Sequence, residues 1–227
     1  MLVTKNDLRL LPQVPFTKTW KPYPHFAVSD MTERVLSYQD IRIVNVKYEL
    51  TKNQQNMFSV YFIEHELSNY RYMLGVRNST DKSFSLGVCS GCTVVVCSNL
   101  CFDGSFKIVN IHNQTLTEER IYSMLLDATH EMMVKSNKTI EWLEALKTIR
   151  WEAQRFKAAV LDILLKRIVP PAMLHQFAVN VAEERRVNKD TTPYVLQNAV
   201  TWFYRDRSFQ LQYSKVNRVN EYLRKIL

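Results

Sequence analysis

Residues 41–77 decide the fold, and they read IRIVNVKYEL-TKNQQN-MFSVYFI-EHELSN-YRYMLGVR. Apolar side chains recur at every second position in three runs of this stretch: Ile41–Leu50, Met57–Ile63 and Tyr70–Arg77. A period of two is typical of a strand that buries one face. The two connectors are polar and short enough for hairpins. We therefore predict three consecutive antiparallel strands.

The segments around this stretch extend the pattern on both sides. Residues 1–24 contain four prolines and read as an extended lead, whereas His25–Gln39 has the apolar spacing of a helix. After the three strands, the β-branched run Thr93–Cys97 and the segment Phe102–Ile111 predict further strands. Residues 83–92 fit either a strand or a short helix.

The second half of the chain has a different periodicity. From Thr115 onward apolar residues recur at helical spacing, and Pro170-Pro171 ends one of the predicted helices. The predicted fold class is α+β, with an antiparallel β-sheet N-terminal part over residues 1–114 and an all-helical C-terminal part over residues 115–227.

The chain is basic, with 30 Lys and Arg against 22 Asp and Glu and a net charge of +8. In the last 23 residues, two acidic residues accompany six basic ones, which are Arg205, Arg207, Lys215, Arg218, Arg224 and Lys225. A positive field of this kind favours polyanions such as DNA, RNA or an acidic protein. No signal peptide and no apolar run of membrane-spanning length is visible, so we expect a cytoplasmic protein without a membrane partner.

Four cysteines form the pattern C-x2-C-x4-C-x3-C at Cys89, Cys92, Cys97 and Cys101. The first pair has the spacing of zinc ligands. The segment between the second and third cysteines is a β-branched run, which favours a buried strand in which cysteine acts as a small apolar residue. We expect strand packing and no bound metal or cofactor, and leave zinc binding as the alternative.

The densest polar segment is Arg77–Ser83, with the sequence RNSTDKS. It fits a tight turn. It also fits a pocket for a phosphate or a nucleobase, in which Arg77 and Lys82 supply positive charge. In an enzyme, Asp81 would act as a base or metal ligand. The candidate binding residues are Arg77, Asn78, Ser79, Asp81, Lys82, Ser83, Asn99 and His112.

Two segments carry a resemblance to a known family. Residues 70–85, YRYMLGVRNSTDKSFS, and residues 91–104, GCTVVVCSNLCFDG, resemble the signature of a phage- and plasmid-borne family, domain of unknown function 932. The segment PYPH that ends at His25 is similar to the family's entry to its first helix. The resemblance implies a phage or mobile-element origin and a sheet followed by helices. It places the polar candidates and Asn99 on recurring polar positions, matches His112 to a family histidine, and supplies no function.

Three functions remain open at this point. The first is a nucleic-acid-binding protein of a phage or mobile element, acting in DNA recombination or single-strand annealing, with single-stranded DNA favoured and self-association left open. The second is an inhibitor of a host defence system or another protein that binds a host protein in the host cytoplasm. The third is a nucleotide- or nucleic-acid-processing enzyme that uses the Asn78–Ser83 loop.

Overall fold

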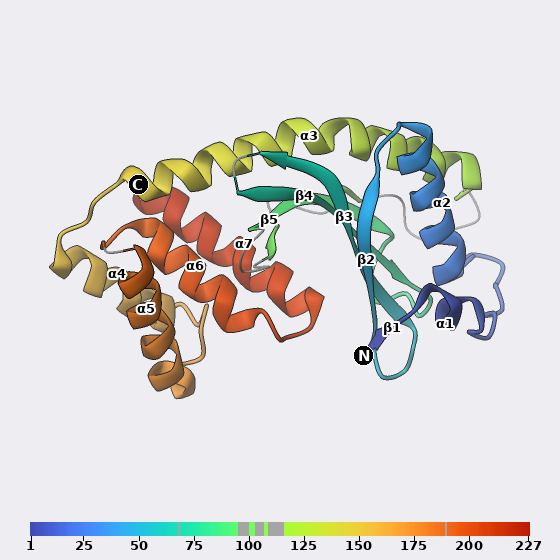
Figure 1. The fold of residues 1–227 in the computed structure, drawn as a ribbon. Helices are drawn as coiled ribbons and strands as arrows, with labels where there is room; N and C mark the ends of the chain where they lie inside the picture. Colours follow the sequence, from blue (N-terminus) through green and yellow to red (C-terminus); the bar gives the residue numbers. More distant parts are fainter. Residues whose placement is uncertain (68, 95–99, 103–106, 109–115, 189) are drawn as a thin grey trace. The chain divides into compact units, whose positions relative to one another are not determined.

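The chain is described by a computed structural model, shown in Figure 1. It describes residues 1–67, 69–94, 100–102, 107–108, 116–188 and 190–227. The chain divides into two compact units. The sheet unit comprises Met1–Gly91 with Gly104–Ser136, and the helical unit comprises Cys92–Asp103 with Asn137–Leu227. A β-sheet precedes a mostly helical part, which confirms the α+β fold class.

The strands follow one another across the sheet in chain order from β1 to β6, and β7 pairs with β5. Their bounds are β1 Leu2–Val3, β2 Ile43–Leu50, β3 Asn56–Leu67, β4 Tyr70–Ser79, β5 Gly87–Val94, β6 Leu100–Phe102 and β7 Lys107–Ile108. The pairs β2–β3 and β3–β4 are antiparallel, and Tyr61 pairs with Val46 on one side and Leu74 on the other. The three strands predicted from residues 41–77 are therefore confirmed, but β3 continues to Leu67 and takes up much of the predicted connector Glu64–Asn69.

Only part of the later strand predictions can be compared with the structure. β5 begins at Gly87 and ends at Val94, so it covers much of the ambiguous segment 83–92 and the start of the predicted strand Thr93–Cys97. The rest of that strand, and most of the predicted strand Phe102–Ile111, lie outside the described residues.

Two helices belong to the first 40 residues. α2 (His25–Tyr38) confirms the predicted helix to within one residue. α1 (Lys5–Arg9) corrects the expectation that residues 1–24 are extended throughout. It begins at a capping box, in which Thr4 Oγ1 accepts from Asp7 N at 3.2 Å and Asp7 Oδ2 accepts from Thr4 N at 2.7 Å.

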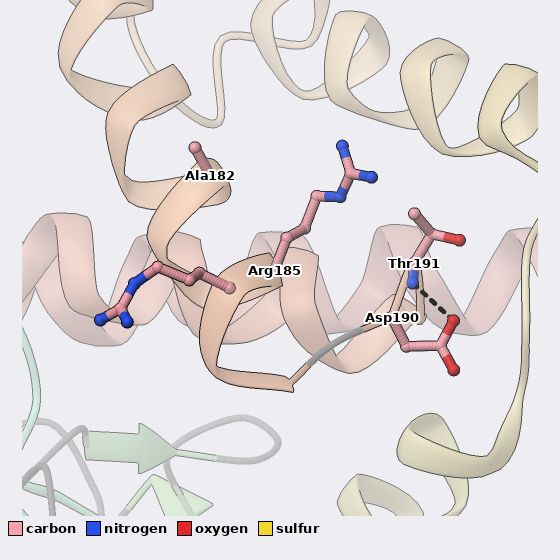
Figure 2. Close-up of a pocket in the computed structure, with 5 residues that line it drawn as sticks. Ala182, Arg185, Asp190 and Thr191 are labelled. Carbon is pink, nitrogen blue, oxygen red and sulfur yellow. Dashed lines mark hydrogen bonds between the residues drawn. The ribbon is translucent and has the colours of Figure 1, made fainter.

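The helices of the second half are α3 Glu118–Thr148, α4 Ala153–Leu165, the short 3-10 helix η1 Pro171–Met173, α5 Leu174–Asn188, α6 Pro193–Tyr204 and α7 Phe209–Ile226 (Figure 1). The part of α3 up to Ser136 belongs to the sheet unit and the remainder to the helical unit. In the helical unit, α5 packs on α6 and α6 on α7 around buried Phe177, Val195 and Val219. A pocket lies at the C-terminal end of α5 (Figure 2).

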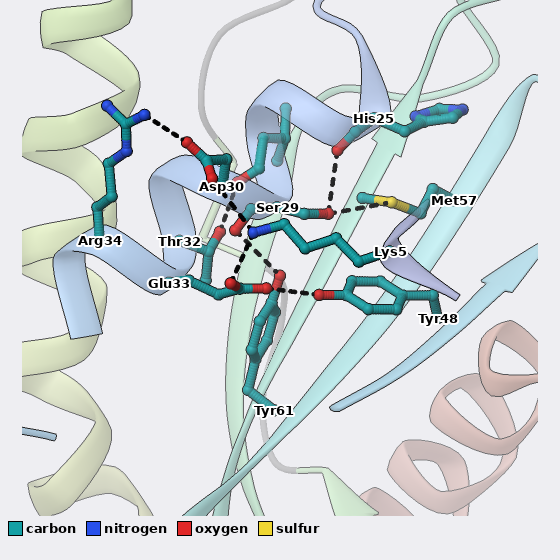
Figure 3. Close-up of polar contacts among 11 residues, drawn as sticks. Lys5, His25, Ser29, Asp30, Thr32, Glu33, Arg34, Tyr48, Met57 and Tyr61 are labelled. Carbon is teal, nitrogen blue, oxygen red and sulfur yellow. Dashed lines mark hydrogen bonds and ion pairs between the residues drawn. The ribbon is translucent and has the colours of Figure 1, made fainter. Parts of the chain in front are cut away.

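A buried tyrosine pair joins α2 to the sheet (Figure 3). The rings of Tyr48 and Tyr61 meet edge to face, with centroids 6.2 Å apart. Tyr48 Oη donates to Glu33 Oε1 at 2.7 Å, and the other oxygen of Glu33 forms an ion pair with Lys5 at 2.7 Å. Because these residues come from α1, α2, β2 and β3, the network fixes the N-terminal helices against the strands.

These contacts predict a loss of stability at alkaline pH. Burial raises the pKa of Tyr61 to about 12, whereas an unfolded tyrosine has a pKa near 10. As the pH rises above 10, the unfolded state loses its phenolic proton first, so unfolding becomes more favourable until the folded pKa is passed. The pKa difference of Tyr61 alone should lower the free energy of unfolding by about 2–3 kcal/mol between pH 10 and 12. Urea unfolding across this range should show a shallower decline for Tyr61→Phe; an equally steep decline would contradict the assignment.

Candidate functional site

The polar segment Arg77–Ser83 lies at the end of β4 and in the turn that follows it. Asn78 and Ser79 are fully buried. The side-chain amide nitrogen of Asn78 lies 2.9 Å from the carbonyl oxygen of Tyr23 and 2.9 Å from Nδ1 of His25. Because an amide nitrogen only donates, His25 Nδ1 accepts and its proton sits on Nε2, which faces Gln54 O at 3.2 Å. Asn78 is therefore used inside the fold.

His25 is the residue that sequence reasoning missed. It is 3% exposed, and it meets Asn78 across 53 positions of the chain. Both residues belong to the segments that carry the family resemblance, which the structure thus brings into contact. The only sequence signal was a histidine placed directly after Pro24, at the first position of α2. Its partner could not be read from local spacing.

The other polar side chains of the loop also form hydrogen bonds within the fold. Ser79 Oγ donates to Phe84 O at 2.8 Å, and Asp81 Oδ1 accepts from Ser83 N at 2.9 Å. Asn56 Nδ2 donates to the other oxygen of Asp81 at 3.3 Å. Partial burial acts to raise the pKa of Asp81, but these hydrogen bonds outweigh it and lower the pKa below its ordinary value. Such a carboxylate is a weak base, and the geometry is that of a tight turn.

The two cations of the loop stack on aromatic rings. The guanidinium of Arg77 lies 5.2 Å from the ring centre of Phe84, and the ammonium of Lys82 lies 5.1 Å from that of Trp20. Lys82 is exposed and has a left-handed backbone, with φ of 68°. Six of the candidate residues therefore lie along the end of β4 and the turn that follows it. Asn99 and His112 lie outside the described residues.

The cysteines that the structure describes are buried. Cys89 is 4% exposed and Cys92 is fully buried, both in β5. Burial raises the pKa of the Cys89 thiol, so a reactive thiolate is disfavoured there. Among the described residues, no group of three or more His, Cys, Asp and Glu side chains is placed to hold a metal ion. Cys97 and the side chain of Cys101 lie outside this description.

A second group of cations lies in the helical unit, and we call it the basic cluster. It consists of Lys166, Arg167, Arg207, Lys215 and Arg218. Lys215 Nζ donates to Arg167 O at 2.8 Å, and the Arg218 guanidinium donates to the same oxygen at 3.4 Å and to Lys166 O at 2.5 Å. Two positive side chains of α7 thus converge on the turn that ends α4.

The local sequence explains why carbonyl groups are available there. α4 ends in a Schellman motif, in which Arg167 N donates to Leu164 O and Ile168 N to Ile163 O, both at 2.9 Å. The motif needs a left-handed residue, usually glycine, and Arg167 takes this position with φ of 52°. An arginine here costs about 1 kcal/mol relative to an unstrained residue. The strained residue thus lies at the point where the two side chains of α7 bond.

The basic cluster lacks acidic partners. Within the described ranges, none of its five side chains forms an ion pair with a carboxylate, whereas Lys5 contacts both Asp30 and Glu33. Partial burial lowers the pKa of Lys215, and the positive charge of Arg218 lowers it further. The arrangement therefore holds like charges close together, and a bound anion would relieve their repulsion.

A buried glutamine fixes the neighbouring turn between α6 and α7. Gln212 is 4% exposed, and its side-chain nitrogen donates to Arg205 O at 3.0 Å and to Arg207 O at 2.6 Å. Arg205 stacks on Trp202, with the guanidinium carbon 4.5 Å from the ring centre. The main chain that carries Arg207 is therefore tied to α7 at a buried point.

Comparison of the chain with protein-family models, with curated proteins and with solved structures gives no match in any of the three. The resemblance to domain of unknown function 932 thus remains a prediction from the sequence. Among the described residues, no helix is both long enough and apolar enough to cross a membrane.

Proposed function

We propose that the protein binds nucleic acid through the basic cluster of its helical unit. The observation that supports this most directly is the convergence of Lys215 and Arg218 on one carbonyl oxygen, with no carboxylate among the described contacts of the cluster. Phosphate groups are the usual partners of Lys and Arg side chains that have no acidic partner. The contact is with the backbone of the nucleic acid and is therefore sequence-independent. Single-stranded DNA is the first ligand to test.

The Arg77–Ser83 loop is the competing surface, since it was the sequence-based candidate. Most of its polar groups bond within the fold, which leaves Lys82 as the exposed cation. The two surfaces can be separated experimentally, because each contains one exposed cation with a left-handed backbone: Arg167 in the basic cluster and Lys82 in the loop.

Arg167→Gly and Lys82→Gly form a matched pair of tests. Glycine adopts positive φ without strain, so each variant should be as stable as the parent or more stable, by up to about 1 kcal/mol. We expect Arg167→Gly to weaken binding of a fluorescent single-stranded oligonucleotide about five- to tenfold at low salt, through the loss of one phosphate contact. Lys82→Gly should leave the affinity unchanged. Fluorescence polarisation and thermal unfolding measure the two effects.

If only Lys82→Gly weakened the binding of the oligonucleotide, the nucleic acid would contact the Arg77–Ser83 loop and not the basic cluster. Absence of binding by the parent protein to single- and double-stranded DNA and RNA at low salt would end the proposal. Because neither variant is expected to unfold, a loss of affinity cannot be attributed to misfolding.

A further inference from the structure

The helical unit contains a pocket that shares no residue with the basic cluster. It is about 600 Å³ in volume and is lined by Ala182, Arg185, Arg186, Asp190 and Thr191 (Figure 2). Its lining side chains are exposed or half-buried, so the pocket is open to solvent. The pocket lies at the end of α5 and in the following loop, and three charged side chains line it: Arg185, Arg186 and Asp190.

One wall of the pocket is held by hydrogen bonds and an ion pair. Trp151 N donates to Thr191 O at 3.0 Å, and Thr191 Oγ1 donates back to Trp151 O at 2.6 Å. Arg150 forms an ion pair with Asp190 at 2.9 Å, next to these two hydrogen bonds. Trp151 itself is 4% exposed. Three contacts between residues 40 positions apart therefore hold the Asp190–Thr191 segment in place before any ligand arrives.

The charges on the lining differ in how far they are compensated. Arg186 makes a two-point contact with Glu183, at 2.6 and 3.0 Å, and Asp190 is paired with Arg150. Arg185 is exposed, and its guanidinium lies over the ring of Phe156 at 5.7 Å. Within the described residues it has no acidic partner. A guanidinium that is stacked on a ring keeps the N–H groups in its own plane available for a two-point contact with an anion.

We infer that this pocket binds a nucleoside phosphate, with Arg185 on the phosphate group. Asp190 Oδ1 accepts from Thr191 N at 2.8 Å and Oδ2 pairs with Arg150, and the remaining lone pairs of this carboxylate can accept from hydroxyl groups of a ligand. A nucleoside phosphate carries the complementary pair, because its phosphate suits the arginine and its ribose hydroxyls donate to a carboxylate. The phosphate belongs either to a free mononucleotide or to the 5′ end of a strand, and the two sources are distinguished by experiment.

The test uses the full chain and isothermal titration with adenosine monophosphate, adenosine and inorganic phosphate. Arg185→Gln should raise the dissociation constant for adenosine monophosphate at least tenfold. Arg9→Gln is the matched control, because Arg9 is an exposed arginine that also lies 5.7 Å from a phenylalanine ring, that of Phe26. The control should bind as the parent does, and adenosine and phosphate should each bind more weakly than the complete nucleotide.

A second titration compares single-stranded oligonucleotides that end in a 5′-phosphate or a 5′-hydroxyl. Tighter binding of the phosphorylated strand, lost in Arg185→Gln, assigns the pocket to strand ends; equal binding assigns it to free mononucleotides. No binding of adenosine monophosphate or of the 5′-phosphate, or the same affinity in Arg185→Gln as in the parent, would overturn the inference. Because Arg167→Gly leaves the pocket intact, failure of the basic cluster and failure of the pocket give different results.

Discussion

Replacing Lys215 and Arg218 together by glutamine is expected to weaken binding of a single-stranded oligonucleotide about fifty-fold at about 50 mM salt. Each phosphate contact releases close to one counterion, so log K changes by about −0.7 per contact for each tenfold rise in salt. Two contacts at this salt concentration correspond to the stated loss. The slope of log K against log salt should also become shallower by about 1.4. Fluorescence polarisation over a salt series measures both quantities.

The matched control for this double variant removes the same charge elsewhere. Lys138 on α3 and Lys157 on α4 are exposed lysines of the helical unit and lie outside the basic cluster. Their double replacement by glutamine should change the affinity and the slope much less. An equal loss in both double variants would mean that the net charge alone matters, and would contradict a localised contact.

Stability must be followed in the same variants, because Lys215 and Arg218 also donate to the carbonyl groups at the end of α4. Their loss should cost about 1–2 kcal/mol in the free energy of unfolding. Circular dichroism and urea unfolding identify the fraction that is folded under the binding conditions. A folded double variant that keeps the parent's affinity and slope would refute the contact.

The parts of the fold that sequence predicted are those encoded locally. The apolar pattern around Val46, Tyr61 and Leu74 extends over whole runs of residues, so it survives small errors in the boundaries. α1 was missed because a five-residue helix has no apolar stripe. Its signal is the Thr4–Asp7 capping box, which is equally compatible with a turn. Likewise, the start of α7 at Phe209 is set by a single cap, Ser208, whose Oγ accepts from Leu211 N.

The candidate sites depended on contacts between distant residues, and these could not be predicted. The charge excess near the C-terminus was visible in the sequence. The contribution of Arg167 was not, since it lies 48 residues before Lys215, which bonds to its carbonyl oxygen. Asn78 was assigned to ligand binding because an asparagine in a polar loop is normally solvated. Its burial follows from Tyr23 and His25, which come from the other end of the sheet unit's sequence.

Asn78→Ala is expected to destabilise the protein by about 2–4 kcal/mol. The substitution removes both hydrogen bonds of the side-chain amide and leaves the Tyr23 carbonyl oxygen and His25 Nδ1 buried without that donor. Each buried polar atom without a partner costs about 1–3 kcal/mol, which is far more than the small change in side-chain volume. Urea unfolding at neutral pH, followed by circular dichroism, gives the free-energy difference.

Asn53→Ala is the matched control for this substitution. Asn53 also bonds through its side chain, to Thr51 and Gln55, but it does so in an exposed turn where water replaces the lost contacts. Its loss should cost less than about 1 kcal/mol.

A structural role and a ligand-binding role of Asn78 predict different results in a binding measurement. If Asn78 is structural, the folded fraction of Asn78→Ala should bind oligonucleotide with the parent's affinity and salt slope, because the basic cluster contains no residue of this network. A variant of unchanged stability that has lost affinity would instead restore Asn78 to the binding site.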